Sequence, residues 1–262
     1  MKPARRIHIG TSGWSYGHWQ GPFYPPGLHV EEWLPFYAQK LDSVEINNSF
    51  YRLPSTSVLK HWRDSVPDDF IFAVKASRFI THMKKLKDPR RSLAKFMRHV
   101  RVLGEKLGPI LFQLPPRWRV NVERLAAFLH ALPADFRYAM EFRDPSWFDP
   151  RVYELLAQHG VACCIYDLDG RLSPSIIITD LVYIRLHGPK GPYQGRYDDR
   201  ALAKWGEAIA SWHREGRDVY CYFDNDEAGY AVQDVLRLRE RLVTAGESRR
   251  DARISATPRR RR

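Results

Sequence analysis

Cysteine is scarce in this chain, with only Cys163, Cys164 and Cys221 among 262 residues. The first two are adjacent, adjacent cysteines rarely bond each other, and no C-x-x-C pair is present. All three lie among β-branched and aromatic residues. We therefore expect buried, reduced thiols and a cytoplasmic location.

Long apolar runs are also missing. No stretch approaches the roughly 20 residues that a helix needs to cross a bilayer. The basic segment 1–6 is followed by the strand-like residues 7–9, not by the apolar core of a signal peptide. We therefore expect neither a membrane partner nor secretion.

Familiar cofactor and metal motifs are absent. No G-x-G-x-x-G follows any strand-like segment, so the organic cofactor, if any, is unknown. The metalloprotease motif H-E-x-x-H does not occur, and no cluster of histidines appears. Carboxylates and a histidine that suit Mg²⁺ or Mn²⁺ are present, but two neighbouring arginines would oppose a dication. A divalent metal is therefore conceivable but not favoured.

Positive charge is concentrated at the C-terminus. The formal net charge is +12, and segment 248–262 holds seven arginines against the single acidic residue Asp251. Such a segment cannot build a core, so we expect a disordered basic tail after a domain of residues 1–247. The tail is either solubilising or a weak, salt-sensitive contact to nucleic acid.

Strand-like and helix-like segments alternate along the rest of the chain. The composition, 44% hydrophobic and 13% aromatic, suits one buried core. The expected strands are residues 7–10, 43–47, 70–75, 109–113, 138–142, 161–167, 181–187 and 218–224. Eight β-α units in this length predict a single-domain α/β fold, a TIM (β/α)8 barrel. A doubly wound open sheet is the alternative.

Polar residues recur at every second position near the strand ends. Residues i and i+2 of a strand share a face, and the outer face of a barrel strand packs under helices. The polar sets should therefore point inward at the C-terminal mouth, where barrel active sites lie. The ionisable residues that converge there are Glu45, Lys75, Glu141, Arg143, Asp167, Arg185, His187 and Asp224.

This ring combines four carboxylates, three fixed cations and one histidine. We interpret Glu45, Glu141, Asp167 and His187 as catalytic acid–base groups. The substrate-binding set is Asn47, Lys75, Gln113, Arg143, Arg185, Gly188, Tyr222, Asp224, Asn225, Trp14 and Tyr16. A purely structural network of salt bridges is the alternative. Lys75 would serve as a Schiff-base nucleophile only with a depressed pKa, and an electrostatic role is favoured.

Two loops complete the predicted site. Gly188 lies in the glycine-containing segment 187–191 after the seventh strand, where barrels commonly hold phosphate, although Pro189 and Pro192 each remove a donor. Trp14 and Tyr16 belong to an aromatic loop after the first strand. Such residues either stack on a sugar or base or simply pack as a lid.

Several segments resemble one known family. They are residues 10–16 (GTSGWSY), 44–47 (VEIN) with 50–52 (FYR), 72–75 (FAVK), 111–116 (LFQLPP), 141–143 (EFR) with 146–147 (SW), and 183–188 (YIRLHG). In this order they are similar to the YecE-like family, domain of unknown function 72, over residues 7–242. The resemblance implies a TIM barrel but no reaction. The family pattern has Asn-Asn where this chain has Asp224-Asn225, which adds a carboxylate.

Three functions remain open from the sequence. The first is an enzyme, a hydrolase or an isomerase or lyase, acting by acid–base chemistry on a small anionic substrate that is phosphorylated or carbohydrate-like. The second is a protein that binds or processes nucleic acid. The third is a non-catalytic module that binds a small molecule. Fold alone does not choose among them, and the oligomeric state is unknown.

Overall fold

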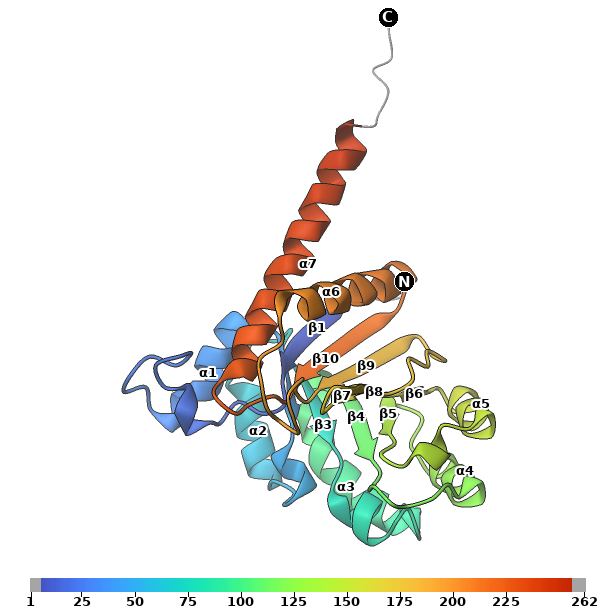
Figure 1. Cartoon of the computed structure of the whole chain (residues 1–262). Coiled ribbons are helices and arrows are strands. Elements are labelled where there is room, and N and C mark those ends of the chain that lie inside the picture. Colours follow the sequence, from blue (N-terminus) through green and yellow to red (C-terminus); the bar gives the residue numbers. More distant parts are fainter. Residues whose placement is uncertain (1–5, 256–262) are drawn as a thin grey trace, which may run out of the picture.

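Strands and helices alternate along residues 6–255, the part of the chain that the computed structural model describes, with side chains to residue 244 (Figure 1). The strands are β1 Ile7–Thr11, β2 Ser43–Ile46, β3 Ile71–Lys75, β4 Leu107–Gln113, β5 Tyr138–Glu141, β6 Val161–Cys163, β7 Ile165–Leu168, β8 Arg171–Leu172, β9 Leu181–Leu186 and β10 Asp218–Phe223. The α-helices are α1 Val30–Lys40, α2 Thr56–Asp64, α3 Pro89–Val100, α4 Val122–His130, α5 Pro150–Gln158, α6 Asp199–Arg214 and α7 Tyr230–Ser255. Short helical turns are η1 Gly17–Trp19, η2 Asn48–Phe50, η3 Phe79–Met83, η4 Arg101–Lys106 and η5 Pro145–Trp147.

Polar caps set where several helices begin. The side chain of Asn121 accepts a hydrogen bond from a backbone N–H of the first turn of α4 at 2.8 Å. Asp198 does the same for α6 at 2.7 Å, and Ser55 for α2 at 3.3 Å. These bonds satisfy N–H groups that have no partner within the helix.

The strands form two five-stranded sheets. One has the order β1-β10-β9-β7-β8 and the other the order β2-β3-β4-β5-β6. Every pairing is parallel except the short β7–β8 hairpin. The parallel α/β class expected from the alternation is confirmed, and parallel strands bring their carboxyl ends to one side.

Two seams lie between the sheets. At the first, Ser12 forms an isolated parallel bridge with Glu45, just beyond β1. Gly10 makes this approach possible, because a Cβ at that position would lie 2.0 Å from the carbonyl oxygen of Ser43. At the second seam, Cys164 alone separates β6 from β7.

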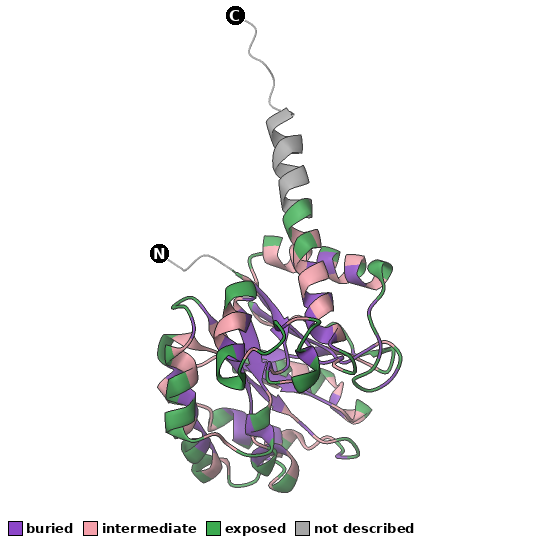
Figure 2. Cartoon of the chain, turned by 90° about the vertical axis from the view of Figure 1, so that its left-hand side faces the viewer, coloured by how far each residue is buried: buried purple, intermediate pink, exposed green. Residues whose placement is uncertain are grey.

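Buried apolar side chains fall into two clusters that follow the alternation along the strands. Val44, Ile46, Phe72 and Val74 belong to the larger cluster, together with apolar residues of the helices. The smaller cluster is formed by residues of the opposite strand face, namely Ala73, Leu111, Ala139, Ala162, Cys164, Leu181, Tyr183, Tyr220 and Tyr222. Figure 2 shows the strands as the buried centre, with exposed residues on the surrounding helices. The strands are therefore buried on both faces, as in other parallel sheets.

The structure differs from the sequence-based expectation at the sixth strand. The expected strand, residues 161–167, is split at Cys164 and followed by the small strand β8. Helix α7 extends past residue 247 to Ser255, and the domain boundary expected at 247 stays a prediction. Residues 256–262 of the expected disordered tail lie outside the described residues. None of the described helices is both long and apolar enough to cross a membrane.

Candidate functional site

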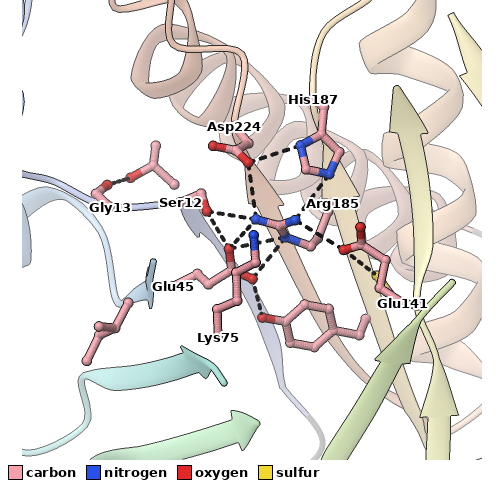
Figure 3. A network of polar contacts seen from close by, with 12 residues as sticks. Ser12, Gly13, Glu45, Lys75, Glu141, Arg185, His187 and Asp224 are labelled. Atoms are coloured by element: carbon pink, nitrogen blue, oxygen red, sulfur yellow. Dashed lines mark hydrogen bonds and ion pairs between the residues drawn. The ribbon is translucent and has the colours of Figure 1, made fainter. Parts of the chain in front are cut away.

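Arg185 of β9 is the centre of a buried cluster of charged groups (Figure 3). Its side chain has no exposed surface. Nε and Nη2 donate to the two carboxylate oxygens of Glu45 at 3.0 and 2.7 Å. Nη1 donates to Glu141 at 3.1 Å, and Nη2 donates to Asp224 at 3.1 Å. Three carboxylates from three strand ends are thus held by one guanidinium group.

The two glutamates have further partners inside the protein. Tyr183 donates its hydroxyl to Glu45 at 2.7 Å, and Ser12 donates to the same carboxylate. Arg143 donates to Glu141. Burial opposes ionisation of Glu141, but Arg143 and Arg185 outweigh it and hold the pKa of this carboxyl well below its usual range. Glu141 is therefore an ionised structural partner at neutral pH.

His187 is held as a neutral imidazole. Its Nε2 lies 2.8 Å from Nη2 of Arg143 and 3.2 Å from Nη1 of Arg185, so this nitrogen accepts. Its Nδ1 lies 3.0 Å from Oδ2 of Asp224. Burial, with Arg185 beside the ring, lowers the pKa of His187. The ring proton accordingly lies on Nδ1, and the edge-to-face ring of Tyr193 packs over the imidazole.

Asp224 connects this cluster to a pocket. Its Oδ2 is occupied by Arg185 and His187. Burial opposes its ionisation, but the bond from His187 and the charge of Arg185 keep its pKa below the usual value. Asp224 also lines the pocket, and among the described residues its Oδ1 has no hydrogen-bond partner. Oδ1 is the oxygen left for a ligand.

Lys75 ends β3 beside the same pocket. Its side chain is buried, with Nζ 4.3 Å from the centre of the Phe50 ring. No carboxylate of the described chain lies within ion-pair distance of Nζ. Burial, followed by the nearby charge of Arg185, lowers the pKa of Lys75 to about 8. This amine is therefore partly neutral close to physiological pH.

The pocket has a volume of about 440 Å³. Carboxylates outnumber cations in its lining, which consists of Tyr16, His18, Asn47, Tyr51, Lys75, Pro192, Tyr193, Gln194, Asp224, Asp226 and Glu227. Asp226 accepts a hydrogen bond from Nε1 of Trp19 at 2.7 Å and lies 2.9 Å from Nε2 of His18. Burial raises the pKa of Asp226 to about 6. We refer to this space as the mouth pocket.

A second pocket of about 500 Å³ adjoins the mouth pocket. The two share Tyr16, Asn47 and Tyr51. Trp14 lines the second pocket, where it packs edge-to-face on Trp62 at 4.8 Å between ring centres. The Oδ1 atom of Asn47 is buried without a partner among the described residues. Three predicted binding residues, Trp14, Tyr16 and Asn47, thus lie beside one continuous space.

Other predicted residues lie away from the mouth pocket. Asp167 accepts from the hydroxyl of Tyr197 at 3.1 Å, and burial raises its pKa. It shares its strand face with Ile165, which belongs to the larger apolar cluster. Position 166 has the inward parity, and there Tyr166 lies under Arg143 at 4.5 Å.

The remaining four predicted residues are not among those that line the mouth pocket. Asn225 donates to the carbonyl of Gly195 and to Asp234, each at 2.9 Å. Tyr222, which belongs to the smaller apolar cluster, shares a hydrogen bond of 2.7 Å with Ser43. Gln113 pairs in register with Glu141. Gly188 has φ of +118°, and a Cβ there would lie 2.2 Å from the carbonyl oxygen of Gln194.

Some residues of the site escaped the sequence-based prediction. Ser12 has the inward parity of the first strand, so the alternation could have identified it. Tyr183 lies two positions before Arg185 and so shares its strand face, which means that the alternation could have identified it as well. His18, Asp226 and Glu227 lie in loops, where strand parity carries no information. No sequence signal would have placed these three beside Lys75.

The sequence analysis also considered a divalent metal and a nucleic-acid contact through the basic tail. Among the residues that the structure describes, no group of three or more His, Cys, Asp or Glu side chains has the arrangement of a metal site. The arginine side chains of 248–262 lie outside the described side chains. Nucleic-acid contact through this tail therefore stays a prediction.

Comparison with known proteins places the chain in a family. A family model described as "Protein of unknown function DUF72" matches residues 8–260. UPF0759 protein YunF of Bacillus subtilis (strain 168) is 26% identical over 270 residues, which cover 90% of this chain and 94% of that protein. UPF0759 protein YecE of Escherichia coli (strain K12) is 31% identical over 143 residues, 54% of this chain and 50% of that protein.

Solved structures agree with this placement. A DUF72 family protein from Thermotoga maritima MSB8 superposes with a TM-score of 0.81 at 29% identity, covering 90% of this chain and 98% of that one. A DUF72 family protein from Enterococcus faecalis V583 gives a TM-score of 0.78 at 20% identity, covering 90% and 95%. The resemblance read from the sequence motifs is confirmed: the chain belongs to the DUF72 family, whose members in this comparison include the UPF0759 proteins YecE and YunF.

Proposed function

We propose that this chain is an enzyme that acts by acid–base chemistry on a small carbohydrate-like substrate in the mouth pocket. The observation that carries the proposal is that Lys75 and Asp226 both line the mouth pocket. Their pKa values, about 8 and about 6, are displaced toward neutrality from opposite sides. An ammonium and a carboxylate of this kind transfer protons efficiently near pH 7.

We also propose that the two sheets close into one (β/α)8 barrel. The bridge from Ser12 to Glu45 supports closure at one seam. At the other seam, the backbone of Cys164 donates to Met140 of β5 at 2.8 Å, while the next residue begins β7. In such a barrel the mouth pocket lies at the carboxyl ends of the strands, where barrel enzymes have their active sites.

The lining of the mouth pocket favours a substrate rich in hydroxyl groups over a phosphorylated one. Asp224, Asp226 and Glu227 are acceptors that bind hydroxyl donors and repel a phosphate dianion. Arg143 and Arg185 were expected to hold an anion, but they donate their hydrogen bonds to Glu141, His187 and other acceptors inside the protein. Of the three cations that were expected to bind an anion (Arg143, Arg185 and Lys75), only Lys75 lines the pocket. Tyrosine rings in the lining provide flat apolar faces of the kind that sugar rings contact.

Each part of the cluster then has a distinct role. Lys75 and Asp226 are the proton-transfer pair, one acting in its acid form and the other in its base form. Asp224 accepts a substrate hydroxyl through Oδ1. Arg185 and His187 hold Asp224 in place through Oδ2. Proton transfer by such a pair is chemistry that isomerases, lyases and hydrolases share.

The test is a panel of aldoses, ketoses, neutral polyols and sugar phosphates. Binding is measured by calorimetry and conversion by NMR. We expect a neutral sugar to bind and be converted, with kcat/KM highest between about pH 6 and pH 8. Asp226→Asn should reduce turnover by roughly 100-fold or more and remove the acidic limb of the profile. The control Asp69→Asn, at an exposed position, should change neither.

Three outcomes would contradict the proposal in different ways. Unchanged turnover in Asp226→Asn removes Asp226 from the chemistry. Binding of a sugar without conversion supports the non-catalytic binding module instead. Binding of sugar phosphates alone restores the phosphorylated substrate class.

A further inference from the structure

We infer that Lys75 is a nucleophile, which forms an imine with the carbonyl carbon of an open-chain aldose or ketose bound in the mouth pocket. The inference rests on the proposed function and specifies its substrate as a sugar with a free carbonyl group. It assigns a covalent step, taken by the neutral amine, to a residue that otherwise serves only in proton transfer.

The amine of Lys75 is buried yet free of the contacts that normally hold a lysine. Its Nζ faces the ring of Phe50 at 4.3 Å, and its side chain is 6% exposed. Glu45 and Glu141, the carboxylates nearest in the cluster, have Arg185 as their partner. A lysine that was needed only for charge balance would form an ion pair with one of them.

The charges that face Lys75 are Arg185, Glu141, Glu45 and Asp224. Burial has the largest effect on its pKa and Arg185 the next, and both favour the neutral amine. The three carboxylates oppose this, but their charges are shared with Arg185. Desolvation beside a second cation is a known way to activate a lysine as a nucleophile.

The pocket suits a small polyhydroxylated carbonyl compound. Its volume of about 440 Å³ lies within the range of small-molecule sites. Asp224, through its unpartnered Oδ1, provides an acceptor for hydroxyl hydrogens in this space. Asp226, which also accepts from Trp19, and Glu227, which also accepts from the backbone of Gly195, line the same space. Asn47, with its unpartnered Oδ1, adds one more acceptor at the boundary with the adjoining pocket. The carbonyl carbon is then the electrophile that meets Nζ.

The step balances without an oxidant or reductant. The neutral amine adds to the carbonyl carbon, a C–N bond forms, and a proton moves from nitrogen to oxygen to give a carbinolamine. Asp226, as its carboxylic acid, protonates the hydroxyl group, which leaves as water. The resulting iminium group withdraws electrons from the neighbouring carbon, and the Asp226 carboxylate accepts the proton released there. Amine and carbonyl thus become an iminium group and water, and loss of the α-proton to Asp226 converts the iminium to an enamine and restores the carboxylic acid of Asp226.

Reductive trapping tests the covalent bond directly. The full chain is incubated with D-glyceraldehyde and sodium cyanoborohydride at pH 7, and labelled lysines are located by peptide mass spectrometry. Lys95, exposed on α3, is the internal reference. Because the neutral fraction at pH 7 is roughly 100-fold larger for an amine with a pKa near 8 than for an ordinary lysine, Lys75 should label on the order of 100-fold faster. Its labelling rate should rise with pH and level off above about pH 8.

Two variants and one independent measurement complete the test. Lys75→Met, close in length and uncharged, should lose the rapid adduct and keep its unfolding transition. Lys95→Met should keep the rapid adduct. Labelling of Lys75 no faster than Lys95, or a rapid adduct that persists in Lys75→Met, overturns the inference. If labelling fails while calorimetry still shows sugar binding and NMR shows turnover, the imine is rejected and the proposed function stands.

Discussion

His187 and Asp224 form a pair in which Nδ1 lies 3.0 Å from Oδ2. Because Nε2 of the same ring faces two guanidinium groups, a second ring proton would have no acceptor. The imidazole therefore presents its Nδ1 side to Asp224 and its Nε2 side to the two arginines. Its burial under Tyr193 is consistent with this positioning role.

This pair predicts a specific dependence of stability on pH. The folded-state pKa of His187 is lower than its usual value of 6.5, so the unfolded chain takes up the proton first as pH falls. The contribution of the neutral imidazole is complete above pH 6.5 and is lost as pH decreases toward the folded-state pKa. His187→Gln should therefore show a shallower loss of unfolding free energy between pH 7 and pH 5, by up to about 1.4 kcal/mol per pH unit.

Urea unfolding at several pH values measures this slope. His159→Gln is the matched control, because His159 lies exposed at the end of α5. Subtracting the variant curve from that of the wild type isolates His187 from carboxylates that titrate in the same range. Identical slopes for the wild type and His187→Gln would show that His187 is not held neutral.

We expect even the conservative substitution Arg185→Lys to lower the free energy of unfolding strongly. Lysine at this position cannot reach Glu45, Glu141 and Asp224 together, so buried carboxylates would lose their partner. Arg185→Lys should lower the free energy of unfolding by about 3–5 kcal/mol. Arg151→Lys, at an exposed ion pair, should change it by less than about 1 kcal/mol. A loss for Arg185→Lys as small as for Arg151→Lys would mean that the network does not hold the strand ends together.

Gly10 tests the seam between β1 and β2, and with it the closure of the barrel. An alanine Cβ would lie 2.0 Å from the carbonyl oxygen of Ser43, so the two strands would have to separate. Gly10→Ala should lower the stability by about 1–3 kcal/mol or more, measured by thermal or urea unfolding. Gly17→Ala has open space around its Cβ and should leave stability almost unchanged. Equal stability of the two variants would show that the seam is open.

Strand alternation was enough to predict most of the buried cluster. The i, i+2 pattern placed Glu45, Glu141, Arg185 and Asp224 on inward faces, and all four meet in the structure. Asp167 was included because it ends a strand, although its parity is that of Ile165. Its separate contact to Tyr197 shows that parity is the stronger guide.

Partners within the cluster could not be predicted. The sequence indicated that cations and carboxylates converge, but not that Arg185 would have all its donors engaged inside the protein. That outcome depends on side-chain reach across strands far apart in the chain, as in the contact of Arg185 with Ser12. Loop residues such as His18 and Asp226 follow no periodicity, so only folding brings them to the pocket.

The sequence by itself determined the α/β class, the order of strands and helices, the family and the inward faces of the strands. These follow from local periodicity and from motifs that are continuous in the chain. Only the tertiary structure decided which charged groups form ion pairs with one another inside the protein and which face the pocket. Lys75 is the clearest case: its lowered pKa arises from burial and from a cation 110 positions away in sequence, Arg185. Desolvation and proximity exist only in the folded chain, and they shift the pKa values of polar residues that the sequence merely lists.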